Sequence, residues 1–185
     1  MNHVLTRDER FIEWLERRRD PKDLGIMAAL RRGLGKRPGT AIEMYPYVVP
    51  FLSQKDSTWH EECMFIVASL FAMHNLPGGK GTMGSVLAKV AQLTGSGSVE
   101  ARFVTLLDST REELPGRLRH AVSLAKSKEV PVDWRQLLAD LKRWNDYNPY
   151  VQRRWARDYW RTPVAGSEDR EDENTDPKEV VPNED

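Results

Sequence analysis

The segment VDWRQLLADLKRW, residues 132–144, indicates the fold class most directly. Its large apolar residues recur at the i, i+3, i+4 and i+7 spacing, which places them on one face of an α-helix: Trp134, Leu137, Leu138, Leu141 and Trp144. Asp133 precedes this pattern and Gln136 follows three residues later, as is typical of a helix N-terminus. We therefore expect a helix over 133–146 whose apolar face packs in a core.

Signals for helices continue on both sides of this segment. Capping-box patterns occur at Thr6-Arg7-Asp8-Glu9, Thr58-Trp59-His60-Glu61 and Thr110-Arg111-Glu112-Glu113. With the apolar spacing they predict helices near 7–19, 22–34, 58–74, 83–94, 98–108, 111–128, 133–146 and 149–161. Phe65-Ile66-Val67 favours a strand by propensity, but it lies within a longer pattern that suits a buried helix. Pro46 and Pro50 break the region 41–52 into turns.

The chain divides best at the glycine-rich stretch 77–84. We expect an all-α fold, a helical bundle built of two small bundles packed together. Its parts are an N-terminal helical part over 1–76 and a C-terminal helical bundle over 77–163. Residues 164–185 combine a dense acidic run with almost no large apolar side chain, which predicts a disordered acidic C-terminal tail.

The charge of the chain is unevenly distributed. The 185 residues contain 28 Lys plus Arg and 28 Asp plus Glu, so the formal net charge is zero. Residues 164–185 hold nine acidic and two basic residues, a net charge of −7, whereas residues 1–163 hold 26 basic and 19 acidic residues, a net charge of +7. The neutral total therefore does not exclude a polyanionic partner for the body of the protein.

Several classes of protein are disfavoured. No apolar run approaches the roughly 18–20 residues that span a bilayer, and the charged first residues do not form a secretory signal. We therefore expect a cytoplasmic protein with no membrane partner. Cys63 is the one cysteine, so it forms no internal disulfide and offers no metal-binding spacing by itself.

Motifs for catalysis or cofactor binding are incomplete. Residues 79–84, GKGTMG, match the G-x-G-x-x-G spacing of dinucleotide sites, but no run of strand and helix units surrounds them, so a loop is favoured. His60-Glu61-Glu62-Cys63 has a cysteine where a zinc protease has its second histidine. The histidines His3, His60, His74 and His120 are scattered. We expect no cofactor, no bound metal and no catalytic residue.

The basic residues are better ordered. On a wheel of the helix 149–161 with Val151 at zero, Trp155 and Tyr159 lie within about 80° of it and mark the core side. Arg153, Arg154, Arg157 and Arg161 fall between about 200° and 300°, and Trp160 borders them near 180°. Such a stripe favours a surface that follows phosphates, with an aromatic face for stacking, whereas the alternative is an ordinary solvated face.

Two other segments carry basic residues beside apolar faces. Around 29–39, ALRRGLGKRPG, one apolar face is formed by Met27, Leu30 and Leu34. Arg32 lies opposite this face and Arg31 at its border, and Lys36 and Arg37 follow in a turn. In the helix after Thr110, Arg119 and Lys126 share a stripe beside the apolar face of Leu114, Leu118, Val122 and Ala125. Solubilising charge explains each of these equally well.

Six segments, in this order, resemble the CasB family, the small subunit of the type I-E CRISPR effector complex Cascade. They are ALRRGLG at 29–35, GTMGSVLAKVA at 81–91, SVEARFVTLLDS at 98–109, LPGRLRHAVSLAKS at 114–127, VDWRQLLADLKRW at 132–144 and VQRRWARDYW at 151–160. Met83 stands where the family pattern suggests an aromatic residue, and the acidic tail lies outside that pattern.

The resemblance implies an all-helical, non-catalytic subunit, present in two copies, of an RNA-guided surveillance complex. It also implies binding of nucleic-acid backbone, stabilisation of the R-loop, and CRISPR RNA, target DNA and other Cascade subunits as partners. The nucleic-acid candidates that it implies are Arg31, Arg32, Lys89, Arg102, Arg111, Arg119, Arg153, Arg154 and Arg157. Lys126 is added because it shares a stripe with Arg119 on the helix after Thr110.

Two alternatives remain open from the sequence. A helical adaptor whose arginine faces dock acidic proteins would show the same stripes. The acidic tail either covers the basic surface of its own chain and discourages nonspecific DNA binding, or it is a passive solubilising extension.

Overall fold

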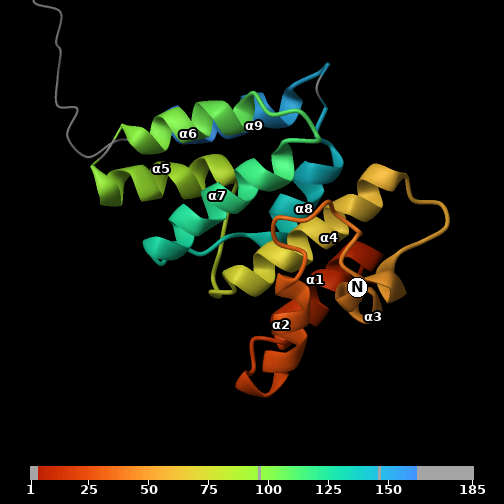
Figure 1. Cartoon of the computed structure of the whole chain (residues 1–185). Helices are drawn as coiled ribbons and strands as arrows, with labels where there is room; N and C mark the ends of the chain where they lie inside the picture. Colours follow the sequence, from red (N-terminus) through yellow and green to blue (C-terminus); the bar gives the residue numbers. More distant parts are fainter. Residues whose placement is uncertain (1–3, 96, 146, 162–185) are drawn as a thin grey trace, which may run out of the picture.

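The computed structural model of the chain is all-α over the residues it describes, 4–95, 97–145 and 147–161, with no strand among them (Figure 1). The α-helices are α1 Arg7–Arg17, α2 Leu24–Arg31, α3 Tyr45–Val48, α4 Thr58–Met73, α5 Met83–Thr94, α6 Ser98–Leu107, α7 Leu114–Ser127, α8 Trp134–Lys142 and α9 Tyr150–Arg161. Short 3₁₀ turns are η1 Pro21–Asp23, η2 Ile42–Met44 and η3 Val49–Phe51. The predicted all-α class is confirmed, and the predicted tail, 164–185, lies outside the described residues.

The helix starts follow the capping signals in part. Thr6 and Glu9 form a complete capping box at α1, and Asp133 accepts the amide of Gln136 at 2.9 Å at the start of α8, as predicted. At α4 the cap is Ser57, one residue before the predicted Thr58, because the Ser57 hydroxyl accepts the amide of His60.

The helix predicted from residue 111 begins later than expected. Thr110 and Glu113 form the reciprocal hydrogen bonds of a capping box, with the Glu113 carboxylate accepting the Thr110 amide at 3.1 Å. These bonds close a turn, and α7 itself begins at Leu114. The pattern is therefore real, but it identifies the turn that leads into the helix.

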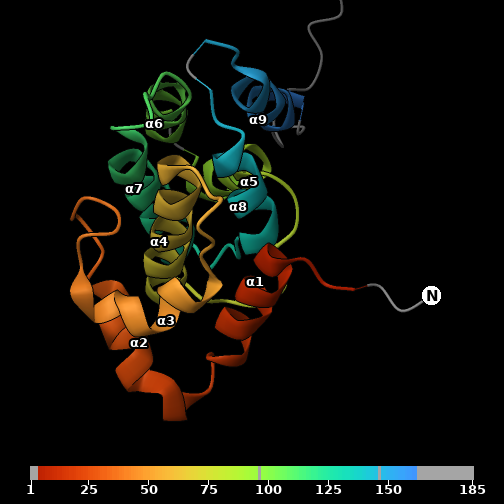
Figure 2. The same cartoon turned by 90° about the vertical axis from the view of Figure 1, so that its right-hand side faces the viewer.

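Helix α4 is the centre of the fold. Residues Cys63 to Ala72 are buried on every side of it, and it packs against α2, α3, α7 and α8 (Figures 1 and 2). A helix that is apolar all round must be covered on all sides, which explains its central place. The interpretation of 65–67 as part of a buried helix is confirmed.

Helix α1 is held against α8 and the loop before α4 by ion pairs. Asp8 pairs with Lys142 at 2.7 Å, Glu9 with Arg135 at 3.1 Å, and Arg7 with Asp56 at 2.6 Å. Partial burial of Asp56 by itself raises its pKa, but the hydrogen bonds from Arg7 and the Ser53 amide outweigh burial, so the pKa lies below the usual aspartate value.

The remaining helices, α5, α6, α7 and α9, pack together at the other end of the molecule (Figure 1). The closest approach lies between α5 and α9, where a Cβ on Gly84 would collide with the backbone of Trp155. Gly84 is the last glycine of the G-x-G-x-x-G match, and it lies inside α5 with no described strand before it. The spacing thus serves helix packing at this point.

The buried apolar side chains form one continuous cluster that reaches from α1 to α9. Helix α8 follows residue 77 in the sequence, yet it packs on α4 and α1. The division at 76 and 77 stays a prediction.

Candidate nucleic-acid interface

Helix α9 presents opposite faces to the core and to solvent. Val151, Trp155 and Tyr159 are buried, as the wheel predicts, and the Tyr159 ring stacks on Phe103 with ring centroids 4.3 Å apart. Asp158, the acid of this helix, faces the core side and accepts the hydroxyl of Thr82 at 2.6 Å. These contacts fix the rotation of α9, so its opposite face points outward.

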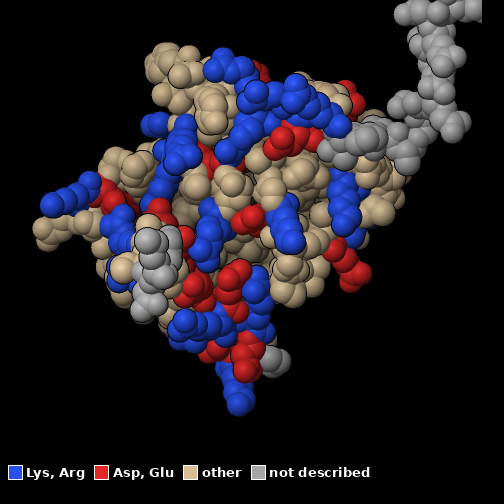
Figure 3. All heavy atoms as spheres, turned by 180° about the vertical axis from the view of Figure 1, so that it is seen from behind, with Lys and Arg blue, Asp and Glu red and all other residues tan. Residues whose placement is uncertain are grey.

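The outward face carries the arginine stripe, which we define as Arg153, Arg157 and Arg161. All three side chains are exposed, and Lys and Arg crowd the upper edge of the molecule where α9 lies (Figure 3). Arg153 also donates to the Asn148 side chain at 3.2 Å. Among residues 4–95, 97–145 and 147–161, no ion pair involves any of the three. Their charge is therefore available to a bound anion.

Arg154 differs from its neighbours. Its guanidinium pairs with the carboxylate of Asp140, which is fully buried. Asp140 also accepts hydrogen bonds from the Trp155 indole N–H at 2.7 Å and from the side-chain amide of Gln136 at 2.8 Å. Arg154 is predicted to contribute to a binding surface, but its guanidinium is used in this internal ion pair. The reason is its position near 300° on the wheel, which borders the core side.

Two aromatic residues accompany the stripe. Tyr150 and Trp160 are 50% and 51% exposed, and the Trp160 ring packs against the Phe103 ring with ring centroids 5.5 Å apart. Tyr150 occupies about 260° on the wheel used for α9, within the arginine sector. Tyr150 is not among the residues predicted from the sequence, although its spacing of three, seven and eleven residues from the stripe arginines indicates the same helix face. Rings beside guanidinium groups suit unpaired bases that stack.

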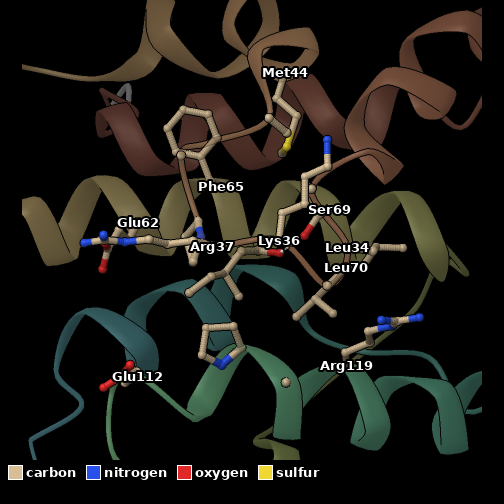
Figure 4. A pocket seen from close by; sticks show the side chains of 18 of the residues that line it. Leu34, Lys36, Arg37, Met44, Glu62, Phe65, Ser69, Leu70, Glu112 and Arg119 are labelled. Atoms are coloured by element: carbon tan, nitrogen blue, oxygen red, sulfur yellow. Dashed lines mark hydrogen bonds between the residues drawn. The ribbon is translucent and has the colours of Figure 1, made fainter.

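A second basic surface is a groove of about 1070 Å³. Its walls come from three separate segments, 33–44 after α2, which includes the loop 33–39, one side of α4 with the residues just before it, and the turn and first residues of α7 (Figure 4). Leu34, Phe65 and Leu70 provide apolar lining, while Lys36, Arg37 and Arg119 provide positive charge. Glu62 and Glu112 also border it, so the groove is mixed in charge with a positive excess.

The loop reaches the groove through a left-handed glycine. Gly35 has a φ of +78°, and a Cβ there would come within 2.8 Å of the Arg119 guanidinium. Any other residue would have a strained backbone here and would also displace the end of the Arg119 side chain. Gly35 thus allows the loop to close against α7 and brings Lys36 and Arg37 to the same groove as Arg119.

Arg111 also lines the groove, but its guanidinium has structural contacts. It donates from Nε and Nη2 to the carbonyl of Trp144, at 3.0 and 2.7 Å, and lies 5.1 Å from the centre of the Trp59 ring. Because Trp144 follows the end of α8, Arg111 connects the turn before α7 to the end of α8. Its charge is only partly available.

The other predicted residues lie outside the groove and the stripe. Arg31 is at the end of α2 and donates from Nε to the Ala72 carbonyl at 2.7 Å, and Arg32 follows it in an exposed position. Lys89, Arg102 and Lys126 are exposed on α5, α6 and α7. The structure therefore brings together Arg111 with Arg119, and Arg153 with Arg157, whereas the remaining candidates are distributed over other helices.

The reactive side chains do not assemble into a site within the described ranges. Those residues contain no group of three or more His, Cys, Asp and Glu side chains placed to hold a metal ion. Cys63 is fully buried, and burial raises the pKa of its thiol, so it lacks the thiolate character of a nucleophile. Within the same part of the chain, none of the helices combines the length and apolar character needed to cross a membrane.

Comparison with known proteins identifies the family. The family model for CRISPR-associated protein Cse2 matches residues 26–160, which is most of the chain. The chain belongs to the Cse2 family. A Cse2 protein of Thermus thermophilus is 38% identical over 168 residues, which cover 89% of this chain and 96% of that relative. The resemblance to CasB that the sequence indicates is confirmed.

Solved structures show the same Cse2 fold. CasB from M. ruber is 30% identical and superposes with a TM-score of 0.72, covering 86% of this chain and 95% of the other. A chain of a CRISPR RNA-guided surveillance complex also reaches a TM-score of 0.72, covering 84% of this chain and 92% of the other, with 24% identity. The residues matched by the Cse2 model include the groove and all of the stripe except Arg161.

Proposed function

We propose that this Cse2 protein is a non-catalytic subunit of a Cascade-type, RNA-guided surveillance complex that binds nucleic-acid backbone and stabilises the R-loop. Membership of the family and the fold shared with a chain of such a complex support the assignment. The observation that carries the binding role is the stripe Arg153, Arg157 and Arg161, exposed and without an ion pair among the described residues. The proposed partners are CRISPR RNA, target DNA, other Cascade subunits and a second copy of the chain, in the cytoplasm.

The mechanism follows from elementary electrostatics. Each guanidinium that contacts a phosphate releases condensed counterions, so binding is favourable and weakens as salt increases. Guide pairing supplies sequence recognition, so backbone contacts are sufficient for this subunit. Tyr150 and Trp160 favour the displaced single strand over duplex, because only unpaired bases can stack on a ring. Holding that strand stabilises the open state of the target.

The groove supports the same function with a different geometry. Cations border the groove from two sides, Lys36 and Arg37 on the loop and Arg119 on α7, next to apolar lining from α4. A single strand bound there places its phosphates against the rim and its bases toward the apolar lining. The expected candidates from the sequence, Arg31, Arg32, Lys89, Arg102, Arg111, Lys126 and Arg154, stay predictions, with weaker support where the guanidinium has internal partners.

The stripe is tested by charge reversal with a matched control. One variant carries R153E, R157E and R161E, and the control carries R10E, K22E and K55E at exposed positions of the N-terminal half. Both change the net charge equally, so nonspecific repulsion is the same. In complexes assembled with each variant, we expect the stripe variant alone to lose most target-DNA affinity, measured by gel shift. Equal losses in the two complexes would contradict a specific role of the stripe.

The adaptor alternative rests on the same exposed arginines, which also suit an acidic protein surface. Competition separates the two functions. If the stripe binds nucleic acid, single-stranded DNA occupies it in preference to an acidic protein partner. An adaptor retains that partner when single-stranded DNA is added, as measured by co-sedimentation.

A further inference from the structure

The arginine stripe lacks acidic neighbours on its own helix face. Among the described residues of α9 the acidic side chain is Asp158, which accepts Thr82 on the core side. The acids that come next in the chain are Glu168, Asp169, Glu171, Asp172, Glu173 and Asp176. Six carboxylates and one basic residue, Arg170, thus lie within the nine residues 168–176, a short distance after a helix that ends in a positive face.

The length of the chain allows these acids to return to the stripe. Helix α9 has 12 residues, so it is about 18 Å long. Residues 162–167, TPVAGS, separate its end from the first acid and can span up to about 20 Å. The random-coil r.m.s. span for 22 residues, the length of 164–185, is about 26 Å, which is comparable to the length of the helix. Attachment to the end of α9 therefore gives the acids a high effective concentration at the stripe.

From this charge complementarity and point of attachment, we propose that the acidic segment 164–185 binds the arginine stripe of its own chain and competes there with nucleic acid. The proposal rests on the proposed function and adds regulation of the same site. Exposed ion pairs are individually weak, so the segment is displaced by a strand that offers many phosphates and further contacts. Short or loosely held nucleic acid does not displace it.

The consequence is a threshold for binding. When an intramolecular segment occupies a site, the apparent affinity for a competing ligand falls by the fraction of free site. The free subunit would then ignore incidental single strands, and the assembled complex would engage a strand already held nearby by guide pairing. High salt weakens the binding of both the acidic segment and nucleic acid to the stripe. The effect of the segment on the apparent affinity for nucleic acid therefore shrinks.

Binding measurements with three proteins test the competition. They are the full chain, a chain ending at Pro163, and a full chain with E168Q, D169N, E171Q, D172N, E173Q and D176N. The ligand is fluorescein-labelled oligo-dT of 30 nucleotides, followed by anisotropy at increasing salt. We expect both altered proteins to bind about tenfold more tightly at low salt, as for a stripe about 90% occupied by the segment, and the difference to disappear at high salt. Equal affinities of all three at low salt would overturn the proposal.

A second background separates local competition from the general effect of removing negative charge. The truncation is repeated with R153Q, R157Q and R161Q, which leave the groove residues unchanged. A segment that acts through the stripe then has little effect on the remaining affinity. A persistent tenfold gain would show long-range charge alone and would overturn the proposal.

A structural readout decides the inference independently of nucleic-acid binding. Cys63 is buried, so N174C provides a single accessible thiol for a spin label. We expect paramagnetic broadening of α9 amide resonances in low salt and its loss in high salt or in the arginine-to-glutamine background. Lack of broadening would overturn the inference. If broadening is present and none of the proteins binds oligo-dT, the proposed function fails while the intramolecular contact stands.

Discussion

Asp140 contributes to the orientation of α9 about its own axis. Its carboxylate is buried between α8 and α9 and accepts hydrogen bonds from Gln136, Arg154 and the Trp155 indole. A buried charge is tolerated when its oxygens are fully paired, as they are here. Since Trp155 and Arg154 lie on adjacent sides of α9, this carboxylate acts together with the contacts of Tyr159 and Asp158 to fix the rotation that turns Arg153 and Arg157 outward.

Removal of this carboxylate should be costly. Asp140→Ala leaves the Arg154 guanidinium and the Trp155 indole without their acceptor, so we expect a loss of about 3 kcal/mol in the free energy of unfolding. Asp108→Ala, at an exposed aspartate, is the control and should change stability by less than about 0.5 kcal/mol. Urea denaturation measures both. A loss below about 1 kcal/mol for Asp140→Ala would contradict the anchoring role.

Residue by residue, the sequence predicts what helix geometry fixes and misses what packing decides. Arg153 and Arg157 are outward because a rigid helix relates them to Trp155, which the spacing already identifies. The pairing of Arg154 with Asp140 joins two helices, 14 positions apart, and depends on their crossing. No local pattern reports such a crossing, so the sequence alone makes Arg154 equivalent to its neighbours.

At the scale of elements, the approach of α5 to α9 depends on the absence of a side chain at Gly84. A methyl group there meets the backbone of Trp155, which cannot move as a flexible side chain would. We expect Gly84→Ala to lower the free energy of unfolding by at least about 1–3 kcal/mol, the usual cost of overpacking. Gly116→Ala in α7, where a Cβ meets nothing within 4 Å, is the matched control.

The control should behave in the opposite direction. In α7 the change from Gly to Ala improves helix propensity, so stability should stay the same or rise by up to about 1 kcal/mol. Thermal unfolding followed by circular dichroism compares the two variants directly. Equal effects of both substitutions would mean that helix propensity, and not the α5 to α9 contact, governs the result.

The attachment of α1 should depend on pH through Asp56. The folded-state pKa of Asp56 is depressed, so its stabilising contribution is present above the unfolded value, near 3.8, and is lost as pH falls through the folded value. We expect Asp56→Asn to reduce stability at pH 7 and to lose this effect progressively below about pH 4. Urea denaturation at several pH values measures it. In an Arg7→Gln background the pH dependence should become much smaller, and its persistence there would contradict the assigned cause.

Helices were predictable as elements, whereas the groove was not. The long helices have apolar spacing or capping signals, and their positions agree within a few residues. Helix α3 was missed because Pro46 and Pro50 indicate turns, yet proline fits the first turn of a helix, where its missing amide is not needed. The groove joins three segments that are distant in sequence, and its geometry follows from how α2, α4 and α7 pack.

At the scale of the whole molecule, the arginine stripe and the groove are two separate cationic surfaces with no residue in common. The stripe lies on α9, and the groove lies between the loop 33–39, α4 and α7. The sequence shows the excess charge as a total, and the fold gathers part of it in these two places, where we propose that a strand binds. Whether one strand uses both surfaces at once is a question of additivity.

The salt dependence of binding counts the phosphates contacted on each surface. For single strands each neutralised phosphate contributes about −0.7 to the slope of log K against log salt. Replacing the three stripe arginines with Gln should make the slope about 2 units shallower, and replacing Lys36, Arg37 and Arg119 with Gln should do the same. Glutamine preserves much of the side-chain length, so steric changes stay small.

If a long strand contacts both surfaces simultaneously, the sixfold variant should lose about 4 units of slope on oligo-dT of 50 nucleotides, because the sets share no residue and their effects add. The three stripe substitutions and the three groove substitutions, measured separately by anisotropy titration over a range of salt, provide the reference values. Circular dichroism establishes that each variant is folded. If the sixfold variant binds DNA no more weakly than the weaker-binding of the two triple variants, only one surface binds DNA. The two-surface arrangement would then have to be abandoned.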